Sequence, residues 1–176
     1  MNTITMTSPA TAARMPARIE SAPSDGPTVR SSLNLIDAGK APEHIRNFLR
    51  LAQAGVYDGT DFHRVVRGFV AQAGALNTRS APLTDRQQKL VHPLQPEFTD
   101  TKHVRGILSM ARGDDPASAT TSFFIVLADA PSLDGKYTVF GHVVDGMDTL
   151  TKIESGPVNG ESPVTRIDIL HVRVLQ

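Results

Sequence analysis

Arg64 is the side chain of this 176-residue sequence whose surroundings most suggest chemistry. It follows the turn Asp58-Gly59 and lies within Phe62 to Val66, where aromatic and β-branched residues favour a β-strand. Side chains alternate along a strand, so Phe62, Arg64 and Val66 are expected to share one face. A guanidinium among apolar neighbours stays charged and must place its five N–H donors. Arg64 is therefore predicted either to pair with an internal carboxylate or to face a ligand.

Gly68 interrupts this strand, and a second extended segment follows it. Val70 and Gln72 have one parity in that segment, and Phe69 has the other. We therefore predict a bulge or bend at Gly68 that brings Phe69 round towards Arg64.

Other kinds of catalytic site find little support in the sequence. His63 faces away from Arg64 on an ideal strand and is predicted to be a hydrogen-bonded structural histidine. The six histidines are scattered, with no close pair backed by carboxylates, so we expect no metal site. The absence of cysteine excludes disulfides and thiolate nucleophiles. We also expect no cofactor.

Composition and charge place the chain in a broad class. A hydrophobic content of 40% over this length indicates one domain with a proper core, at residues 16–176, after a disordered tail at residues 1–15. Eighteen basic residues balance eighteen acidic ones, so no long-range field attracts nucleic acid or a membrane. No apolar run resembles a signal-peptide core or a membrane span. We therefore expect a cytoplasmic protein, and we expect it to be a monomer.

Two helices are predicted outside residues 77–102. The clearer one begins near Pro42, which suits a first helical turn, and ends at Gly55. The second is the shorter Met147–Glu154, with Met147, Leu150 and Ile153 facing inward. The apolar stripe of the first helix consists of Ile45, Phe48, Leu49 and Ala52.

Short strands account for most of the remaining chain. A hairpin turn is predicted at residues 24–27, and residues 77–102 are predicted to be an ordered surface excursion with a short helix near residues 84–90. Many short strands with two helices predict a closed barrel capped at its ends. The predicted strands are residues 17–20, 29–35, 62–66, 106–111, 122–127, 137–144 and 167–175.

Three motifs carry a likeness to a known family. They are Phe62-His63-Arg64 with Gly68-Phe69 and Gln72, then Gly106-Ile-Leu-Ser-Met-Ala-Arg112 running to Phe123-Phe124, then Leu133-Asp134-Gly135-Lys136 with Val139-Phe140-Gly141. In order and spacing, this chain resembles the cyclophilins, which are peptidyl-prolyl cis-trans isomerases, from about residue 16 to its end. The resemblance implies a mainly β fold, a closed eight-stranded antiparallel β-barrel capped by two α-helices, with a substrate groove on its outside.

The same resemblance implies roles for single residues. Arg64 matches the catalytic arginine, and other matching positions form the proline pocket or contact the substrate backbone. The proline pocket would include Phe69, Val70, Phe124 and Leu133, and the further substrate contacts would include Gln72, Ala111, Arg112, Ser122 and Tyr137.

Some of these positions depart from the family pattern. Ser122 stands where the family usually has Gln, Val70 where Met is common, and Arg112 where Asn is common. Taken alone, Arg112 could be merely a solvated loop residue. Ser132 replaces the Trp that contacts cyclosporin in sensitive members, so the resemblance implies weak cyclosporin binding.

The resemblance implies a peptidyl-prolyl cis-trans isomerase that acts on X-Pro bonds of peptides and flexible or unfolded protein segments. The alternative is a proline-peptide binding module or chaperone on the same scaffold with weak turnover. The retained Arg64 favours the isomerase, whereas the substitutions around it are the only support for the binding module.

Overall fold

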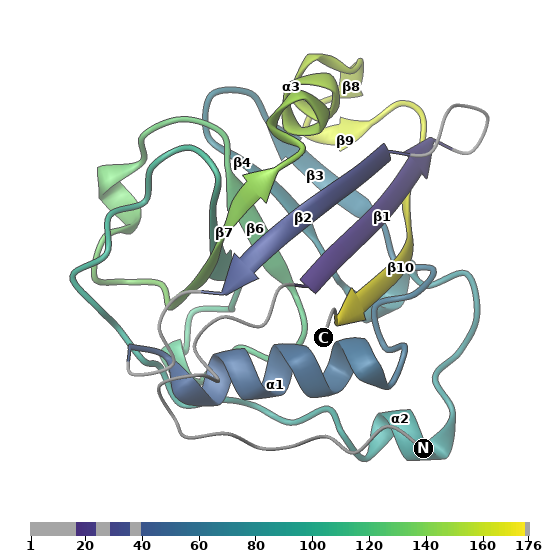
Figure 1. Ribbon diagram of the computed structural model, residues 1–176, viewed down its shortest axis with the longest axis vertical. Helices are drawn as coiled ribbons and strands as arrows, with labels where there is room; N and C mark the ends of the chain where they lie inside the picture. Colours follow the sequence, from purple (N-terminus) through teal and green to yellow (C-terminus); the bar gives the residue numbers. More distant parts are fainter. Residues whose placement is uncertain (1–16, 24–28, 36–39, 175–176) are drawn as a thin grey trace.

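Most of the chain folds around one eight-stranded antiparallel sheet (Figure 1). The structure is a computed structural model, and it describes residues 17–23, 29–35 and 40–174. The strands follow the order β10-β1-β2-β7-β5-β6-β4-β3. Their bounds are β1 Ala17–Pro23, β2 Val29–Leu35, β3 Phe62–Val66, β4 Val70–Ala73, β5 Ile107–Met110, β6 Phe123–Val126, β7 Val139–Asp145 and β10 Ile167–Val174. A separate hairpin pairs β8, Val158–Asn159, with β9, Ser162–Pro163.

The two edge strands of the sheet, β3 and β10, approach each other without forming a ladder. Among the described residues, Asp61 and Asp168 form a single bridge between the two edges, next to the hydrogen bond from Ile169 N to Thr60 O. The prediction of a mainly β fold with eight antiparallel strands is confirmed. The predicted closure of the sheet into a barrel is not confirmed. The backbone of β10 instead contacts residues 59–61, which precede β3.

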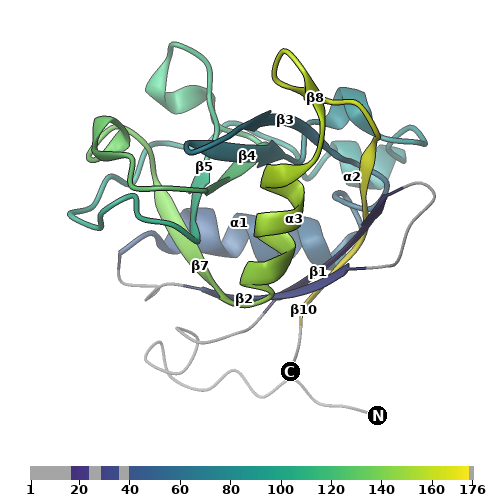
Figure 2. The same ribbon diagram turned by 90° about the horizontal axis from the view of Figure 1, so that it is seen from above.

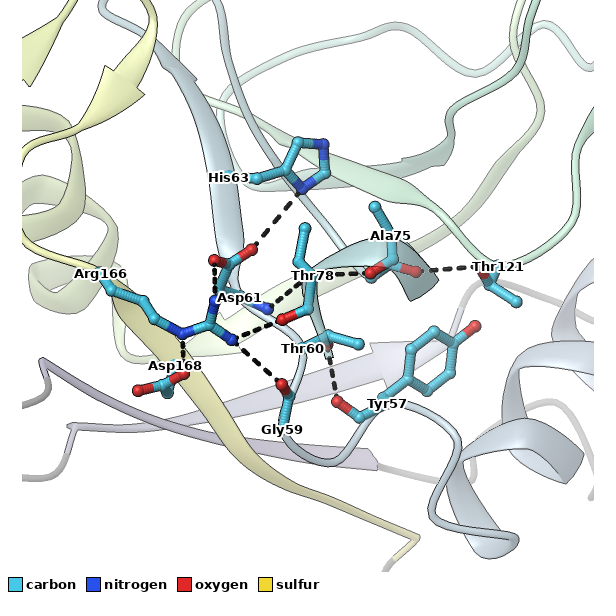
Figure 3. Close-up of polar contacts among 11 residues, drawn as sticks. Tyr57, Gly59, Thr60, Asp61, His63, Ala75, Thr78, Thr121, Arg166 and Asp168 are labelled. Atoms are coloured by element: carbon cyan, nitrogen blue, oxygen red, sulfur yellow. Dashed lines mark hydrogen bonds and ion pairs between the residues drawn. The ribbon is translucent and has the colours of Figure 1, made fainter. Parts of the chain in front are cut away.

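Arg166 links these two edges (Figure 3). Its guanidinium lies 2.8 Å from Asp61 Oδ2 and 2.5 Å from Asp168 Oδ1, and it donates to the Gly59 and Thr78 carbonyl oxygens. These side-chain contacts therefore add to the backbone hydrogen bonds that join β10 to the residues before β3.

His63 lies beside this cluster, with its Nδ1 4.0 Å from Asp61 Oδ1 (Figure 3). That distance is too long for a hydrogen bond, and Nδ1 has no other partner among the described residues. The prediction that His63 is a hydrogen-bonded histidine is therefore wrong for this nitrogen, because Arg166 holds Asp61 at its other oxygen.

The helices cover opposite ends of the sheet. Figures 1 and 2 show α1, Pro42–Gln53, at one end and α3, Met147–Ser155, at the other. The aromatic rings of Phe48, Tyr57, Phe123 and Phe140 pack together, with neighbouring centroids 5.0–6.5 Å apart. The inward stripes of both helices are confirmed, with Leu49 and Met147 only partly buried. No helix in the described parts of the chain is both long and apolar enough to cross a membrane.

Helix α1 begins and ends as its sequence predicts. Pro42 occupies the first turn, and Gly55 stops the helix with φ 68°, a conformation that glycine adopts without strain. The Glu97 carboxylate also accepts hydrogen bonds from the backbone N–H groups of Glu43 and His44. A residue of the long excursion thus caps the positive end of the helix.

Strand β3 departs from the predicted alternation. Its ladder with β4 shifts register between Phe62 and Arg64, so Phe62 and Val65 both enter the core. The prediction that Phe62, Arg64 and Val66 share one face is therefore wrong, because an irregularity in the ladder reverses the parity between Phe62 and Arg64. The bulge or bend predicted at Gly68 takes the form of a tight turn, in which Gly68 has φ 68° and Phe69 N donates to Val66 O.

The other predicted elements form with small shifts at their ends. The excursion contains α2, Asp85–Gln88, which begins with a capping box between Thr84 and Gln87. The final strand starts at Ile167 as predicted. The predicted tail at residues 1–15, the turn at 24–27 and the strand end at residue 175 lie outside the described residues.

Candidate functional site

A second apolar cluster lies on the outer face of the sheet, opposite the core. Adjacent residues of β6 show the division, because Phe123 packs in the core while Phe124 packs in the outer cluster. The outer cluster comprises Val70, Ile107, Ala111, Phe124, Val126, Ala130, Leu133 and Val139, with Phe69 and Tyr137 partly buried against it. Six residues predicted for the proline pocket and its surroundings therefore meet in one place, namely Phe69, Val70, Ala111, Phe124, Leu133 and Tyr137.

Phe124 is the central ring of this cluster. Tyr137 meets it edge to face, with centroids 5.6 Å apart, and His103 stacks on it at 6.2 Å. Leu133 comes from a short 3₁₀ turn, Pro131–Leu133, and is 8% exposed. Leu133 and Phe124 meet because the 3₁₀ turn and β6, which are separate in the chain, lie against the same outer face of the sheet.

Arg64 lies beside the cluster, across neighbouring strands. The β-ladders pair Arg64 of β3 with Gln72 of β4, and Gln72 with Phe124 of β6. Arg64 Nη1 is 3.5 Å from Gln72 Oε1, and the Arg64 side chain is 35% exposed. The arrangement places a guanidinium next to an apolar surface.

Glu161 pairs with Arg64 and was missed by sequence reasoning. Its carboxylate accepts from Arg64 Nε at 2.6 Å and from Nη2 at 3.3 Å. The Arg64 hydrogen bond lowers the pKa of Glu161 below its ordinary value. Arg64 thus has a carboxylate partner, but that partner is 55% exposed rather than internal. A separation of 97 residues left no local signal for the pair.

Arg112 and Ser122 each contact a residue of the cluster. The Arg112 guanidinium sits 4.7 Å from the centre of the Tyr137 ring, and its Nη2 donates to Lys136 O at 3.0 Å. Arg112 is therefore held on the loop next to Tyr137 and is not simply solvated. The carbonyl oxygen of half-buried Ser122 accepts from Ala111 N at 2.9 Å.

A buried polar network lies beneath Phe124 and was also missed. His103 Nδ1 lies 3.0 Å from Asp134 Oδ1, and His103 Nε2 lies 3.1 Å from Ser109 Oγ. Ser109 Oγ is also 2.9 Å from Thr138 O. This resembles a serine–histidine–aspartate relay, but Ser109 is fully buried and cannot meet a substrate. The network therefore supports the site from below.

Burial and hydrogen bonding shift the pKa values in this network. Burial lowers the pKa of His103, which favours the neutral ring. The His103 backbone N–H, followed by its ring, lowers the pKa of Asp134 to about 2. Within the described residues, no group of three or more His, Cys, Asp or Glu side chains could hold a metal ion.

Comparisons with known proteins point in one direction. The family model described as cyclophilin type peptidyl-prolyl cis-trans isomerase/CLD matches residues 33–174. A peptidyl-prolyl cis-trans isomerase of Arabidopsis thaliana is 45% identical over 136 residues, covering 74% of this chain and 60% of the relative. A probable peptidyl-prolyl cis-trans isomerase of Brucella abortus is 39% identical over 122 residues, covering 66% and 62%. The chain thus spans about three fifths of the length of these two relatives.

Solved structures show the same likeness. A crystal structure of a Cryptosporidium parvum cyclophilin type peptidyl-prolyl cis-trans isomerase matches with a TM-score of 0.77 and 27% sequence identity. The match covers 93% of this chain and 98% of that one. A second structure of the Cryptosporidium protein, determined in the presence of the dipeptide Ala-Pro, matches with a TM-score of 0.76, 28% identity and coverage of 92% and 99%.

Proposed function

Because the chain belongs to the cyclophilin-type peptidyl-prolyl cis-trans isomerase family, we propose that it catalyses rotation about X-Pro bonds of peptides and flexible protein segments. The observation that carries this proposal is the position of Arg64, which lies in register with Gln72 and Phe124 beside the outer apolar cluster. A hydrogen-bond donor and an apolar surface at adjacent positions can hold the two halves of an X-Pro unit.

Rotation about an X-Pro bond is slow because amide resonance resists it. Twisting an ordinary peptide bond faces a barrier of about 18–20 kcal/mol, and the twisted state of an X-Pro bond has a localised lone pair on the proline nitrogen. Arg64 can donate to that nitrogen or to the displaced carbonyl oxygen, and this contact strengthens only as resonance is lost. Each tenfold in rate needs about 1.4 kcal/mol of such differential stabilisation, so a few hydrogen bonds suffice. No bond is made or broken.

The apolar cluster supplies the other half of the mechanism. A proline ring packed on Phe124, Leu133 and Phe69 stays fixed while the acyl side of the bond rotates. Val70, Ala111 and Tyr137 belong to the same surface, and Gln72, Arg112 and Ser122 lie beside it with groups for the peptide backbone. The structure of the Cryptosporidium relative was determined in the presence of the dipeptide Ala-Pro, so an Ala-Pro peptide is a suitable probe for this surface.

The test is a protease-coupled isomerisation assay on an Ala-Pro peptide, with Arg64→Ala beside the wild type. We expect the wild type to accelerate isomerisation of the peptide. In Arg64→Ala, turnover should fall about a hundredfold, with only a small change in peptide affinity. Arg67→Ala is the matched control, because Arg67 lies on the same hairpin but donates to Glu154 O and Gly156 O. Wild-type turnover in Arg64→Ala would disprove the role of Arg64. If the wild type binds the peptide but does not accelerate its isomerisation, the binding module would be favoured.

A further inference from the structure

The β8–β9 hairpin delivers Glu161 to Arg64 by two separate contacts. Gly160 and Glu161 form the loop between Asn159 and Ser162, and Gly160 has φ 62°. The Glu161 carbonyl oxygen accepts from Val65 N at 2.7 Å, which docks the hairpin on β3. Its carboxylate then reaches the neighbouring Arg64 side chain. Backbone and side chain of Glu161 are therefore both fixed to β3.

The carboxylate engages one particular edge of the guanidinium. Nε and Nη2 form the side-on edge, and both donate to Glu161. The remaining N–H groups of Arg64 belong to Nη1 and Nη2. Nη1 is directed at Gln72, at the long distance of 3.5 Å, so it can exchange this partner for a substrate atom at little cost. The contacts at Nε and Nη2 therefore hold the plane of the guanidinium. The end-on edge, formed by Nη1 and Nη2, remains for the substrate.

An exposed ion pair adds little to folding stability, because water screens it and ordering two long side chains costs entropy. For a group that donates to a twisted peptide bond, however, orientation matters more than stability. An unpaired arginine side chain would lose rotational freedom about several bonds each time it bound the substrate, which costs conformational entropy. A partner that holds the plane beforehand removes that cost from the reaction.

We propose that Glu161 is a positioning residue for Arg64, holding the side-on edge of its guanidinium so that Nη1 stays directed at Gln72, the neighbour of Phe124 in the sheet. This inference rests on the proposed isomerase function. Glu161 acts only through Arg64, and its removal disorders the donor in the free enzyme without removing any part of the apolar surface. Its effect therefore falls on turnover and leaves peptide binding unchanged.

The first experiment measures kcat and KM of Glu161→Gln on the Ala-Pro peptide. We expect kcat to fall about two- to fivefold with KM unchanged, because glutamine keeps the size but loses the charge of the bidentate pair. Ser162→Ala is the matched control, since it changes an exposed neighbour on the same hairpin. Wild-type kcat in Glu161→Gln would overturn the proposal. A raised kcat would also overturn it, by showing that Glu161 restrains Arg64.

A double-mutant cycle tests whether Glu161 affects turnover only through Arg64. In the Arg64→Ala background, Glu161→Gln should cause no further loss of turnover, because the residue that it positions is gone. An equal loss in both backgrounds would show that Glu161 acts by another route. The cycle also separates the two proposals. If Arg64→Ala keeps wild-type turnover, the proposed function of Arg64 fails, whereas if only Glu161→Gln keeps it, the positioning role alone fails.

A readout without catalysis completes the test. In nuclear magnetic resonance spectra, the Arg64 Nε–H of the wild type should exchange slowly with water, because it donates to Glu161 at 2.6 Å. The exchange should accelerate in Glu161→Gln and stay slow in Ser162→Ala. Unchanged exchange in Glu161→Gln would show that the pair does not hold Arg64 in solution.

Discussion

His103 stacks against Phe124, with 6.2 Å between the ring centroids and 23° between the ring planes. One side of this pair faces a polar network and the other faces the outer apolar cluster. His103 is fully buried, and both ring nitrogens lie within hydrogen-bonding distance of Asp134 or Ser109. The apolar surface therefore depends on buried polar groups beneath it, which has consequences for stability.

His103→Ala should destabilise the protein strongly. It leaves Ser109 without one partner, removes a hydrogen bond to Asp134 and opens a cavity behind Phe124, which together cost about 2–4 kcal/mol of unfolding free energy. Chemical denaturation measures the change. Lys102→Ala is the control, because Lys102 also pairs with Asp134 but is 72% exposed, so its loss should shift stability by less than about 0.5 kcal/mol. Equal losses in both variants would contradict the structural role of His103.

Asp134 should make stability fall in acid. Its pKa drops from 3.8 to about 2 on folding, so the folded state binds its proton more weakly than the unfolded state. The contribution to stability is complete above about pH 4, declines as the pH falls and is lost below about pH 2. Thermal unfolding midpoints over this range should fall less steeply in Asp134→Asn, which cannot titrate. Parallel profiles for wild type and variant would rule out this assignment.

Phe124→Ala should weaken the binding of proline peptides, because it removes the central ring of the outer cluster. Phe124 is only 4% exposed, so the same change costs about 3–5 kcal/mol of stability. Peptide affinity must therefore be measured by calorimetry on variant protein shown to be folded. Phe98→Ala provides the control, because Phe98 is exposed and lies outside both apolar clusters. Unchanged affinity in folded Phe124→Ala would place the pocket elsewhere.

Local sequence patterns predicted most of the fold. Pro42 and Gly55 bound the first helix because each acts through its own backbone, by a fixed φ in one case and a positive φ in the other. Strand β3 was also predicted with its observed bounds, Phe62–Val66. The faces of β3 were not, because the register shift between Phe62 and Arg64 arises in the pairing with β4 and leaves no mark in the sequence of β3.

The candidate site shows a similar division. The motifs named Arg64, Gln72 and Phe124, and the ladders bring these residues into register. The contacts of His103 with Asp134 and of Arg64 with Glu161 join residues that are 31 and 97 positions apart. Such pairs depend on how distant segments meet in space, so no spacing or composition rule could find them.

Cyclosporin should bind this protein weakly, and Ser132→Trp should strengthen the binding. Ser132 lies exposed in the turn Pro131–Leu133, next to the apolar cluster, where drug-sensitive cyclophilins carry a Trp. An indole there adds a buried apolar contact and an N–H donor, together worth about 2–4 kcal/mol or one to three decades in Kd. Arg112 is poorly placed to substitute, because its guanidinium is held on Tyr137 and Lys136 O. Titration of the drug against both proteins measures the effect on isomerase activity. Tight inhibition of the wild type, or no gain in Ser132→Trp, would show that this position does not set drug sensitivity.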